Sequence, residues 1–529
     1  MKTNGKGFKV LAFCLILLMA VGLFGTTAFA IASNGTGTIT VSGVEDGVTV
    51  SAYRLMDVKV NENGQPQEPV YTWVDAAASW VRTNTNYSAY IGTGTDNSVQ
   101  AAFSTASAEN IAAFYDALAA AIKTTNNPLN IPVAGTCTGS GSITNLTMGN
   151  YLILIENGMR VYRPSAVNLV PEWKDTEWVM SDAEVTVKSS EPTITKTVNG
   201  KKADNASIGD TVSFVIETDV PQFPASALAK NYAVSDILPA GLTLTGSIKV
   251  SGVTGAESDP LTEGDGNDYT QGSARPNNGG NSAFTLTFDY ARISEYEKIR
   301  IEYTATLNRS AVLGETGNVN NAYLDYSNNP YTQTSWESKS DSATIYTYGM
   351  DISKVDKDDH DTFLAGAEFE LYATEEETAD KTNAIAFVML SEGVYCKAAA
   401  SDTSTTTTLQ VGAKDSLTGK LTIKGLSEGT WYLKEITAPD GYNLLASPVK
   451  VTIEDKDGDV LDGKVSGAAA NATGEAVALV TLTVENDDGF QLPVTGGMGT
   501  ILFTAVGILL MGAAVILLIF AVRKNRKQS

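Results

Sequence analysis

The chain is poor in cysteine, histidine and positive charge. Its 529 residues include three cysteines, one histidine and 37 lysines and arginines against 60 acidic residues, which gives a net charge of −23. So acidic a chain is a poor partner for nucleic acid. Cys137 and Cys396 are too few and too far apart for a disulfide scaffold, and the lone histidine, His360, lies in an acidic loop without a triad partner.

Metal and cofactor motifs are also missing. The acidic run from Asp455 to Asp459 begins like a calcium loop, but Val460 and Ser466 stand where that loop needs glycine and glutamate. No segment has the pattern of a phosphate, flavin or nicotinamide site. We therefore expect neither a metal nor a cofactor.

Both ends of the chain carry topogenic signals. Three lysines, the apolar run 10–24 and the small-x-small site Ala28–Ala30 predict a cleaved secretory signal peptide over residues 1–30. Residues 500–522 contain no charge and are long enough for a transmembrane helix. Four basic residues follow and place the C-terminus in the cytoplasm: Arg523, Lys524, Arg526 and Lys527.

The part between these signals should lie outside the cell. Removing residues 1–30 and 496–529, which hold three and four basic residues and no acid, lowers the net charge from −23 to −30. Extracellular domains are commonly stabilised by disulfides, which this one lacks. Another source of toughness is therefore expected.

Alternating short runs of Val, Ile, Thr and Tyr predict a mainly β protein of tandem immunoglobulin-like β-sandwich domains. Helical spacing of apolar residues appears at 107–123 and again near 74–81, so the N-terminal domain should contain some helix. We expect an N-terminal domain at 31–188, a linker beginning at Lys188, and two further domains at 191–348 and 349–490. Residues 491–529 form the C-terminal signal.

Two strands place a lysine on an apolar face. Side chains two apart in a strand share a face, so Lys196 lies with Ile194 and Val198, and Lys354 lies with Ile352. An unpaired ammonium in a core is very costly. Each lysine could simply snorkel at a strand end or pair with a carboxylate.

The same two domains also place an acid and an asparagine on apolar faces, in the same order along the chain. Asp236 and then Asn320 follow Lys196, while Glu435 and then Asn486 follow Lys354. If the strand register differs, Asn318 or Asn321 takes the place of Asn320. The repeated order indicates two matched trios.

Such a trio suits one reaction. Burial favours a neutral lysine amine, which is a nucleophile, and a neutral carboxylic acid, which can hydrogen-bond an amide and move protons. Attack of the amine on the asparagine carboxamide would release ammonia and leave a Lys–Asn isopeptide bond. Packing in a core supplies the effective concentration that this slow exchange needs. Asp236 and Glu435 are the expected catalytic acids.

The C-terminal signal contains a short motif, Leu492-Pro493-Val494-Thr495-Gly496, just before the apolar span and the basic tail. With those two segments it resembles the cell-wall sorting signal of Gram-positive surface proteins. In that family, a sortase cleaves between the residues that correspond here to Thr495 and Gly496.

The rest of the chain resembles the major, or backbone, pilins of Gram-positive sortase-assembled pili. YLKEITAPDGYNLL at 432–445 is similar to the pilin E-box, and MDISKVDKDD with the closing TVEN is similar to collagen-adhesin B-type domains. YAVSDILPAGLTL and GNVNNAYLDYSNNP resemble a fimbrial isopeptide-forming domain. The resemblance implies the Lys, acid and Asn roles given above.

A backbone pilin also needs an acceptor lysine at the end of its N-terminal domain. The family pattern ends V-x-V-Y-P-K, whereas this chain has Val185-Thr-Val187-Lys188 without Tyr-Pro. Alternation places Lys188 outward. Lys201 and Lys202 compete with it, while Lys196 faces inward.

We therefore expect a shaft subunit at the cell surface, covalently anchored to the cell wall, that is a sortase substrate and not a turnover enzyme. Its expected partners are a pilus sortase, other copies of itself, ancillary pilins, peptidoglycan through a housekeeping sortase, and a host surface ligand. The alternatives are a wall-anchored monomeric adhesin and an ancillary tip or base pilin. A wall-bound hydrolase would need an exposed acid pair or a nucleophile–base set.

Overall fold

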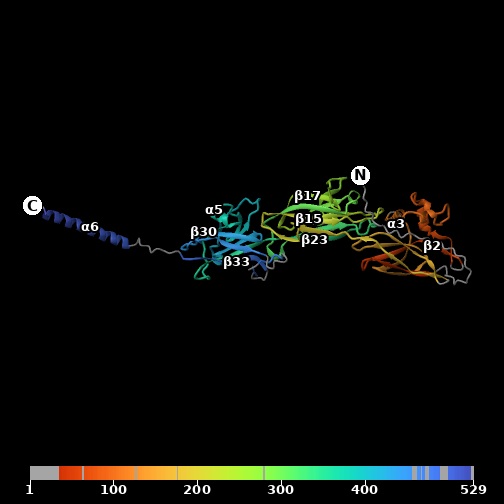
Figure 1. Ribbon diagram of the computed structural model, residues 1–529, viewed down its shortest axis with the longest axis horizontal. Coiled ribbons are helices and arrows are strands. Elements are labelled where there is room, and N and C mark those ends of the chain that lie inside the picture. The colour runs from red at the N-terminus through yellow and green to blue at the C-terminus, as the bar shows by residue number, and fades with distance from the viewer. Residues whose placement is uncertain are drawn as a thin grey trace. The chain divides into compact units, whose positions relative to one another are not determined.

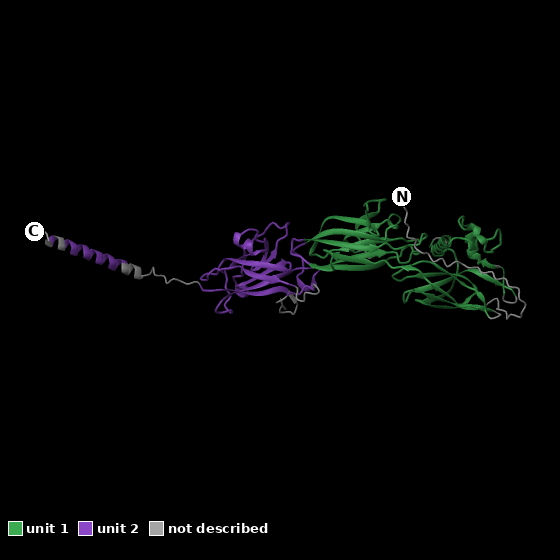
Figure 2. Ribbon diagram, in the orientation of Figure 1, with its two compact units in different colours: residues 1–204, 211–306, 319–344 green, residues 205–210, 307–318, 345–529 purple. Residues whose placement is uncertain are grey.

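The computed structural model describes residues 35–61, 65–125, 128–174, 177–277, 280–454, 462–465, 468–470, 476–488 and 498–525. The chain divides into two compact units (Figures 1 and 2). One comprises residues 1–204, 211–306 and 319–344, and the other comprises 205–210, 307–318 and 345–529. Strands dominate both units, as the alternating sequence predicts.

The first part of the chain holds two main sheets. One has the order β11 (Ala183–Thr186), β1 (Thr36–Ser42), β5 (Gly141–Thr147). The other has the order β3 (Pro66–Trp73), β2 (Thr49–Val60), β6 (Gly149–Glu156), β8 (Ser165–Leu169), with β4 (Val133–Thr138) also paired to β2. Two small ribbons join β9 (Pro171–Lys174) to β10 (Glu177–Met180) and β7 (Val161–Tyr162) to β12 (Ser189–Ser190).

Both predicted helical segments are confirmed. They form α1 (Asp75–Thr83) and α3 (Ala108–Lys123), with the short α2 (Ala101–Ser104) between them. The Ser107 side chain caps α3 by accepting a hydrogen bond from the Asn110 backbone N–H. Phe114 of α3 is fully buried and contacts five other aromatic rings, namely those of Trp73, Trp80, Tyr87, Tyr90 and Phe103, in addition to its neighbour Tyr115.

The middle of the chain forms a β-sandwich. One sheet has the order β13 (Ile194–Val198), β15 (Thr211–Asp219), β21 (Lys298–Leu307), β17 (Leu242–Thr254), β18 (Glu257–Pro260). The facing sheet has the order β14 (Ala203–Asn205), β23 (Glu337–Tyr346), β22 (Asn318–Tyr326), β16 (Tyr232–Ile237), β20 (Asn281–Phe288), β19 (Tyr269–Ala274). The sheets meet where the ring of Phe284 on β20 lies 5.2 Å from that of Tyr303 on β21. The short α4 (Tyr290–Ile293) follows β20.

The last part of the described ectodomain is a second sandwich. Its larger sheet has the order β26 (Phe387–Ser391), β27 (Val394–Lys397), β29 (Lys420–Leu426), β24 (Tyr348–Asp356), β33 (Ala476–Asn486), β32 (Ala468–Ala470). The smaller sheet has the order β28 (Leu409–Gln410), β25 (Glu368–Tyr372), β30 (Gly429–Thr437), β31 (Val449–Ile453). A shared core joins them through buried residues such as Ile352, Phe369 and Leu433. The short α5 (Glu375–Asp380) follows β25.

A C-terminal helix, α6 (Met498–Asn525), covers the predicted transmembrane segment. Within the part of the chain that the structure describes, no helix meets the combined length and hydropathy needed to cross a membrane. The predicted signal peptide lies outside the described residues.

The aromatic cluster around Phe114 should carry much of the stability of the first part of the chain. Phe114→Ala should lower its free energy of unfolding by about 3–5 kcal/mol, because the change removes a fully buried ring and leaves a cavity. Differential scanning calorimetry should therefore show one transition at lower temperature. Asn110→Ala, on the exposed face of the same helix, should leave that transition in place. Equal transition temperatures in the two variants would contradict the stabilising role of the Phe114 cluster.

Candidate functional site

The first trio lies in the core of the middle sandwich. Lys196 on β13 and Asp236 on β16 belong to facing sheets, and both side chains are fully buried. The alternation in β13 explains the lysine, because Ile194 and Val198 occupy the same inward face. The Lys196 ammonium donates a hydrogen bond to Asp236 Oδ2. It also lies 5.3 Å from the ring centre of Phe214, within cation–π distance.

A tyrosine completes this group. The Tyr303 hydroxyl on β21 donates to Asp236 Oδ2 at 2.8 Å, and Asn320 Nδ2 on β22 donates to the same hydroxyl at 2.8 Å. Asn320 is fully buried, and Tyr303 is almost so. The sequence analysis did not include Tyr303. A signal existed, because Tyr303 alternates inward with Ile301 and Ala305, and a buried tyrosine hydroxyl needs a polar partner.

Of the three asparagines that the sequence left open, Asn320 is the one that reaches this group. Asn318 is held elsewhere, since its carboxamide accepts from Val312 N and donates to Val312 O and Ile345 O at 2.9–3.0 Å. Asn321 is only half-buried and, being one residue further along β22, projects to the other face.

The second trio lies in the C-terminal sandwich, and all its side chains are buried: Lys354 on β24, Glu435 on β30 and Asn486 on β33. Asn486 Nδ2 donates directly to Glu435 Oε2 at 3.0 Å. Lys354 Nζ instead donates to the Val484 carbonyl at 3.0 Å. β24 and β33 are parallel neighbours, with Lys354 level with Val484 and Asp356 level with Asn486.

The two trios share the same unsatisfied atoms. Among the described residues, eight buried side-chain polar atoms lack a hydrogen-bond partner, and four of them belong to the trios: Asp236 Oδ1, Asn320 Oδ1, Glu435 Oε1 and Asn486 Oδ1. Each trio therefore contains one carboxyl oxygen and one carboxamide oxygen without a donor. Leaving such acceptors unpaired in a core is costly. A proton on the acid would provide a donor for the amide oxygen.

Burial shifts the pKa values of both lysines and of Asp236. It lowers the pKa of the Lys196 ammonium to about 8, although Asp236 acts in the opposite direction. It likewise lowers the pKa of Lys354 to about 8. Burial raises the pKa of the Asp236 carboxyl, while Lys196, Tyr303 and Asn320 offset part of that rise. Both lysines are thus closer to the neutral amine than an exposed lysine would be.

The predicted acceptor, Lys188, is exposed between β11 and β12. The linker predicted to begin at Lys188 starts with an ordered segment, because Ser189–Ser190 pair with β7 and the Lys188 carbonyl accepts from Arg163 N at 2.9 Å. Lys201 and Lys202 are also exposed, and each pairs with an acid, Asp204 and Asp341 respectively. Lys196 is buried and cannot be reached from outside.

Two further segments fall outside the described residues. They are the sorting motif Leu492–Gly496, which contains Thr495, and the acidic run 455–459. Elsewhere in the described chain, no group of three or more His, Cys, Asp or Glu side chains could hold a metal ion.

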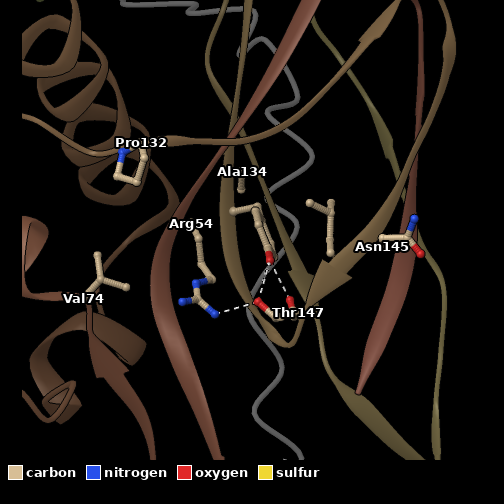
Figure 3. Close-up of a pocket in the computed structure, with 8 residues that line it drawn as sticks. Arg54, Val74, Pro132, Ala134, Asn145 and Thr147 are labelled. Carbon is tan, nitrogen blue, oxygen red and sulfur yellow. Dashed lines mark hydrogen bonds between the residues drawn. The ribbon is translucent and has the colours of Figure 1, made fainter. Parts of the chain in front are cut away.

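A cavity of about 360 Å³ lies in the N-terminal part of the chain (Figure 3). Val74, Pro132, Ala134 and Leu146 contribute its apolar lining. Its one cation is already engaged, since Arg54 donates to Thr147 Oγ1 at 2.6 Å and lies 3.3 Å from Asp57. The cavity contains no candidate nucleophile–base set.

Three family models match the chain. A Gram-positive pilin backbone subunit 2, Cna-B-like domain matches residues 208–330, and a prealbumin-like fold domain matches 349–465. An LPXTG cell wall anchor motif matches 485–529. Each trio thus includes residues inside one of the two domain matches, Asp236 and Asn320 in the first and Lys354 and Glu435 in the second.

The chain is also similar to two curated proteins and to a solved structure. It is 26% identical to the trypsin-resistant surface T6 protein of Streptococcus pyogenes over 97% of this chain and 99% of that one. It is 25% identical to a fimbrial subunit type 1 of Actinomyces viscosus over 61% and 63%. The structure of the T6 backbone pilin of S. pyogenes, at 19% identity, has a TM-score of 0.57 and covers 87% of this chain and 100% of that one, which supports the fold.

The depressed pKa of Lys196 has a consequence for stability. In Asn320→Ala, Lys196 is a free amine, and burial lowers its pKa from the ordinary value of 10.5 to about 8 in the folded chain. Between these values the unfolded chain binds a proton that the folded chain does not. The free energy of unfolding of this variant should therefore rise by about 3 kcal/mol as the pH increases from 8 to 10.5.

The matched control is Asn320→Ala combined with Lys196→Met, which lacks the titrating group. Calorimetry should show that the free energy of unfolding rises with pH across this range in the single variant and rises less in the double variant. Parallel pH curves would contradict the lowered pKa.

Proposed function

We propose that this chain, a Gram-positive backbone pilin with an LPXTG cell wall anchor, forms a pilus shaft by joining Thr495 of one subunit to Lys188 of the next. The anchor motif and the backbone-pilin domain support its place in a cell-wall-anchored surface pilus. The similarity to the T6 protein extends over nearly the whole chain.

Internal Lys–Asn bonds, Lys196–Asn320 and Lys354–Asn486, are the second part of the proposal. The observation that carries it is the pair of unpartnered oxygens, one on the acid and one on the amide, that recurs in both trios. A neutral acid would hydrogen-bond the amide oxygen and make the amide carbon more electrophilic. A neutral amine is the matching nucleophile.

The reaction balances without a cofactor. Lys196 Nζ attacks Asn320 Cγ, the Cγ–Nδ2 bond breaks, and the nitrogen leaves as ammonia after taking up a proton that the amine gives up. Asp236 receives and returns protons and is unchanged at the end. Lys354, Asn486 and Glu435 take the same roles in the second domain.

The bonds would join different kinds of strand pairs. Lys196 and Asn320 lie on facing sheets, whereas Lys354 and Asn486 lie on neighbouring parallel strands of one sheet. They enclose 124 and 132 residue steps. By analogy with disulfides of that span, each would add on the order of 4–5 kcal/mol to the free energy of unfolding.

We infer that the secreted chain resists proteases, as the name of the T6 relative says of that protein.

For polymerisation, a pilus sortase would cleave between Thr495 and Gly496 and hold Thr495 as an acyl-enzyme. Lys188 of another subunit would attack that acyl group. Its exposure supports the role, and the hydrogen bond from Arg163 N to its carbonyl orders the backbone that carries it. A housekeeping sortase would finally attach the fibre to peptidoglycan, and ancillary pilins would join it.

The domain limits we propose are 31–188, 191–348 and 349–490, followed by the sorting signal at 491–529. The chain would act as a sortase substrate and not as a turnover enzyme. The acids singled out are buried, which does not suit a hydrolase that must bind an external substrate.

Mass spectrometry tests the internal bonds. The intact secreted chain should be about 17 Da lighter per bond than its sequence, because each bond releases ammonia. Asp236→Ala should restore one such increment and Glu435→Ala the other. Glu302→Ala, which removes a half-buried acid on β21 that pairs with Arg300, should restore neither. A wild-type mass equal to that of the sequence would remove the proposal of internal bonds.

Immunoblots of wall extracts under denaturing conditions test the polymer. Wild-type cells should give a ladder that survives boiling, and Lys188→Ala should reduce it to monomer because the acceptor amine is gone. Lys201→Ala is the matched exposed-lysine control and should keep the ladder. A ladder that survives Lys188→Ala would move the acceptor elsewhere, and a single wall-linked band in wild type would favour the monomeric adhesin.

A further inference from the structure

Tyr303 lies between the acid and the amide of the first trio. Its hydroxyl is 2.8 Å from Asp236 Oδ2 and 2.8 Å from Asn320 Nδ2. The second of these atoms is the nitrogen that would leave as ammonia. A hydroxyl can accept one proton while it donates another, so this group joins the acid to the leaving nitrogen.

The second trio makes the same connection without a hydroxyl. There, Asn486 Nδ2 donates directly to Glu435 Oε2 at 3.0 Å. Glutamate is one methylene longer than aspartate. The first domain has the shorter acid and a tyrosine, and the second has the longer acid alone. We infer that both trios connect the acid to the leaving nitrogen, one through a hydroxyl and the other directly.

We propose that Tyr303 is a catalytic residue that relays a proton from Asp236 to the leaving nitrogen of Asn320. This inference rests on the proposed Lys196–Asn320 bond. As Lys196 Nζ bonds to Asn320 Cγ, the amine proton passes to Asp236. Asp236 then gives a proton to the Tyr303 oxygen, and the Tyr303 proton passes to Nδ2 as the Cγ–Nδ2 bond breaks. Tyr303 and Asp236 end as they began, and ammonia leaves.

The surroundings of Tyr303 suit this role. Its ring stacks on that of Phe214 at 5.4 Å and 17°, and meets Phe284 edge-on at 5.2 Å, so the hydroxyl is held in one place. Burial raises the pKa of Tyr303 well above its ordinary value, which keeps the hydroxyl protonated between transfers. The side chain is 3% exposed, so bulk water has little access to replace it.

Tyr303→Phe tests the relay because it keeps the ring and removes only the hydroxyl. The full chain would be made by cell-free synthesis and quenched in denaturant at intervals, and the masses of its proteolytic peptides would be followed. The bond at Lys354 should form at the wild-type rate and serve as an internal reference. The loss of about 17 Da at Lys196 should be slowed on the order of 100-fold.

Two further variants separate chemistry from packing. Tyr232→Phe removes another buried tyrosine hydroxyl, on the same strand as Asp236, and should leave both rates unchanged. Asp236→Glu combined with Tyr303→Phe should recover at least about tenfold over Tyr303→Phe alone, because the longer acid can reach the amide as Glu435 does.

Three outcomes would overturn the relay. They are a Tyr303→Phe rate within twofold of wild type, an equal slowing by Tyr232→Phe, and a double variant no faster than Tyr303→Phe. A wild-type chain that loses no mass at all would instead refute the internal bonds themselves, so failure of the relay and failure of the proposed function give different results.

Discussion

The structure depends on what a β-sandwich core does to a buried lysine. Lys196 and Lys354 have no exposed surface, and burial lowers the pKa of each to about 8. An ammonium in such a place is tolerated only beside a carboxyl or a carbonyl, and the chain supplies Asp236 in one case and Val484 O in the other. The same burial that destabilises the ammonium favours the neutral amine, which is the nucleophile of the proposed reaction. Converting the amine to an amide would remove the charge altogether. The free-energy cost of burying the ammonium would therefore favour the reaction.

The two sandwiches arrange this chemistry differently. In the first, the lysine comes from one sheet, and the acid and the amide come from the other, so the group spans the core. In the second, the lysine and the asparagine lie on adjacent parallel strands, and the acid alone crosses from the facing sheet. The acid differs between the two trios: Asp236 acts with Tyr303 in one, and Glu435 contacts the asparagine directly in the other. In both trios, one carboxyl oxygen and one carboxamide oxygen lack a hydrogen-bond donor.

Much of this could be predicted from the sequence, because a strand has a period of two. The alternation in Ile194–Val198 and Leu482–Asn486 was enough to place Lys196 and Asn486 inward, and helical spacing was enough to locate α3. The same alternation places Tyr303 inward, but it does not single this tyrosine out. A tyrosine on an apolar face is ordinary, and its importance arises only when β21 and β22, which belong to different sheets, bring it against Asn320. The order around Lys188 was missed for a similar reason, since its partner Arg163 is 25 residues away in the chain.

The positions of the proposed bonds bear on how a fibre would carry load. The chain has 307 residue steps between Lys188, which would be bonded to one neighbouring subunit, and Thr495, which would be bonded to the other. The bonds Lys196–Asn320 and Lys354–Asn486 would bypass 124 and 132 of them, which leaves 51 in the covalent path. Those 51 steps include most of β22, all of β23, most of β24 and the short segments next to Lys188 and Thr495. Most strands of both sandwiches would then carry no tension. Their hydrogen bonds would need only to keep the trios packed while the isopeptide bonds form. The folded domains would therefore need thermodynamic stability during assembly, whereas the finished fibre would resist tension through its covalent bonds.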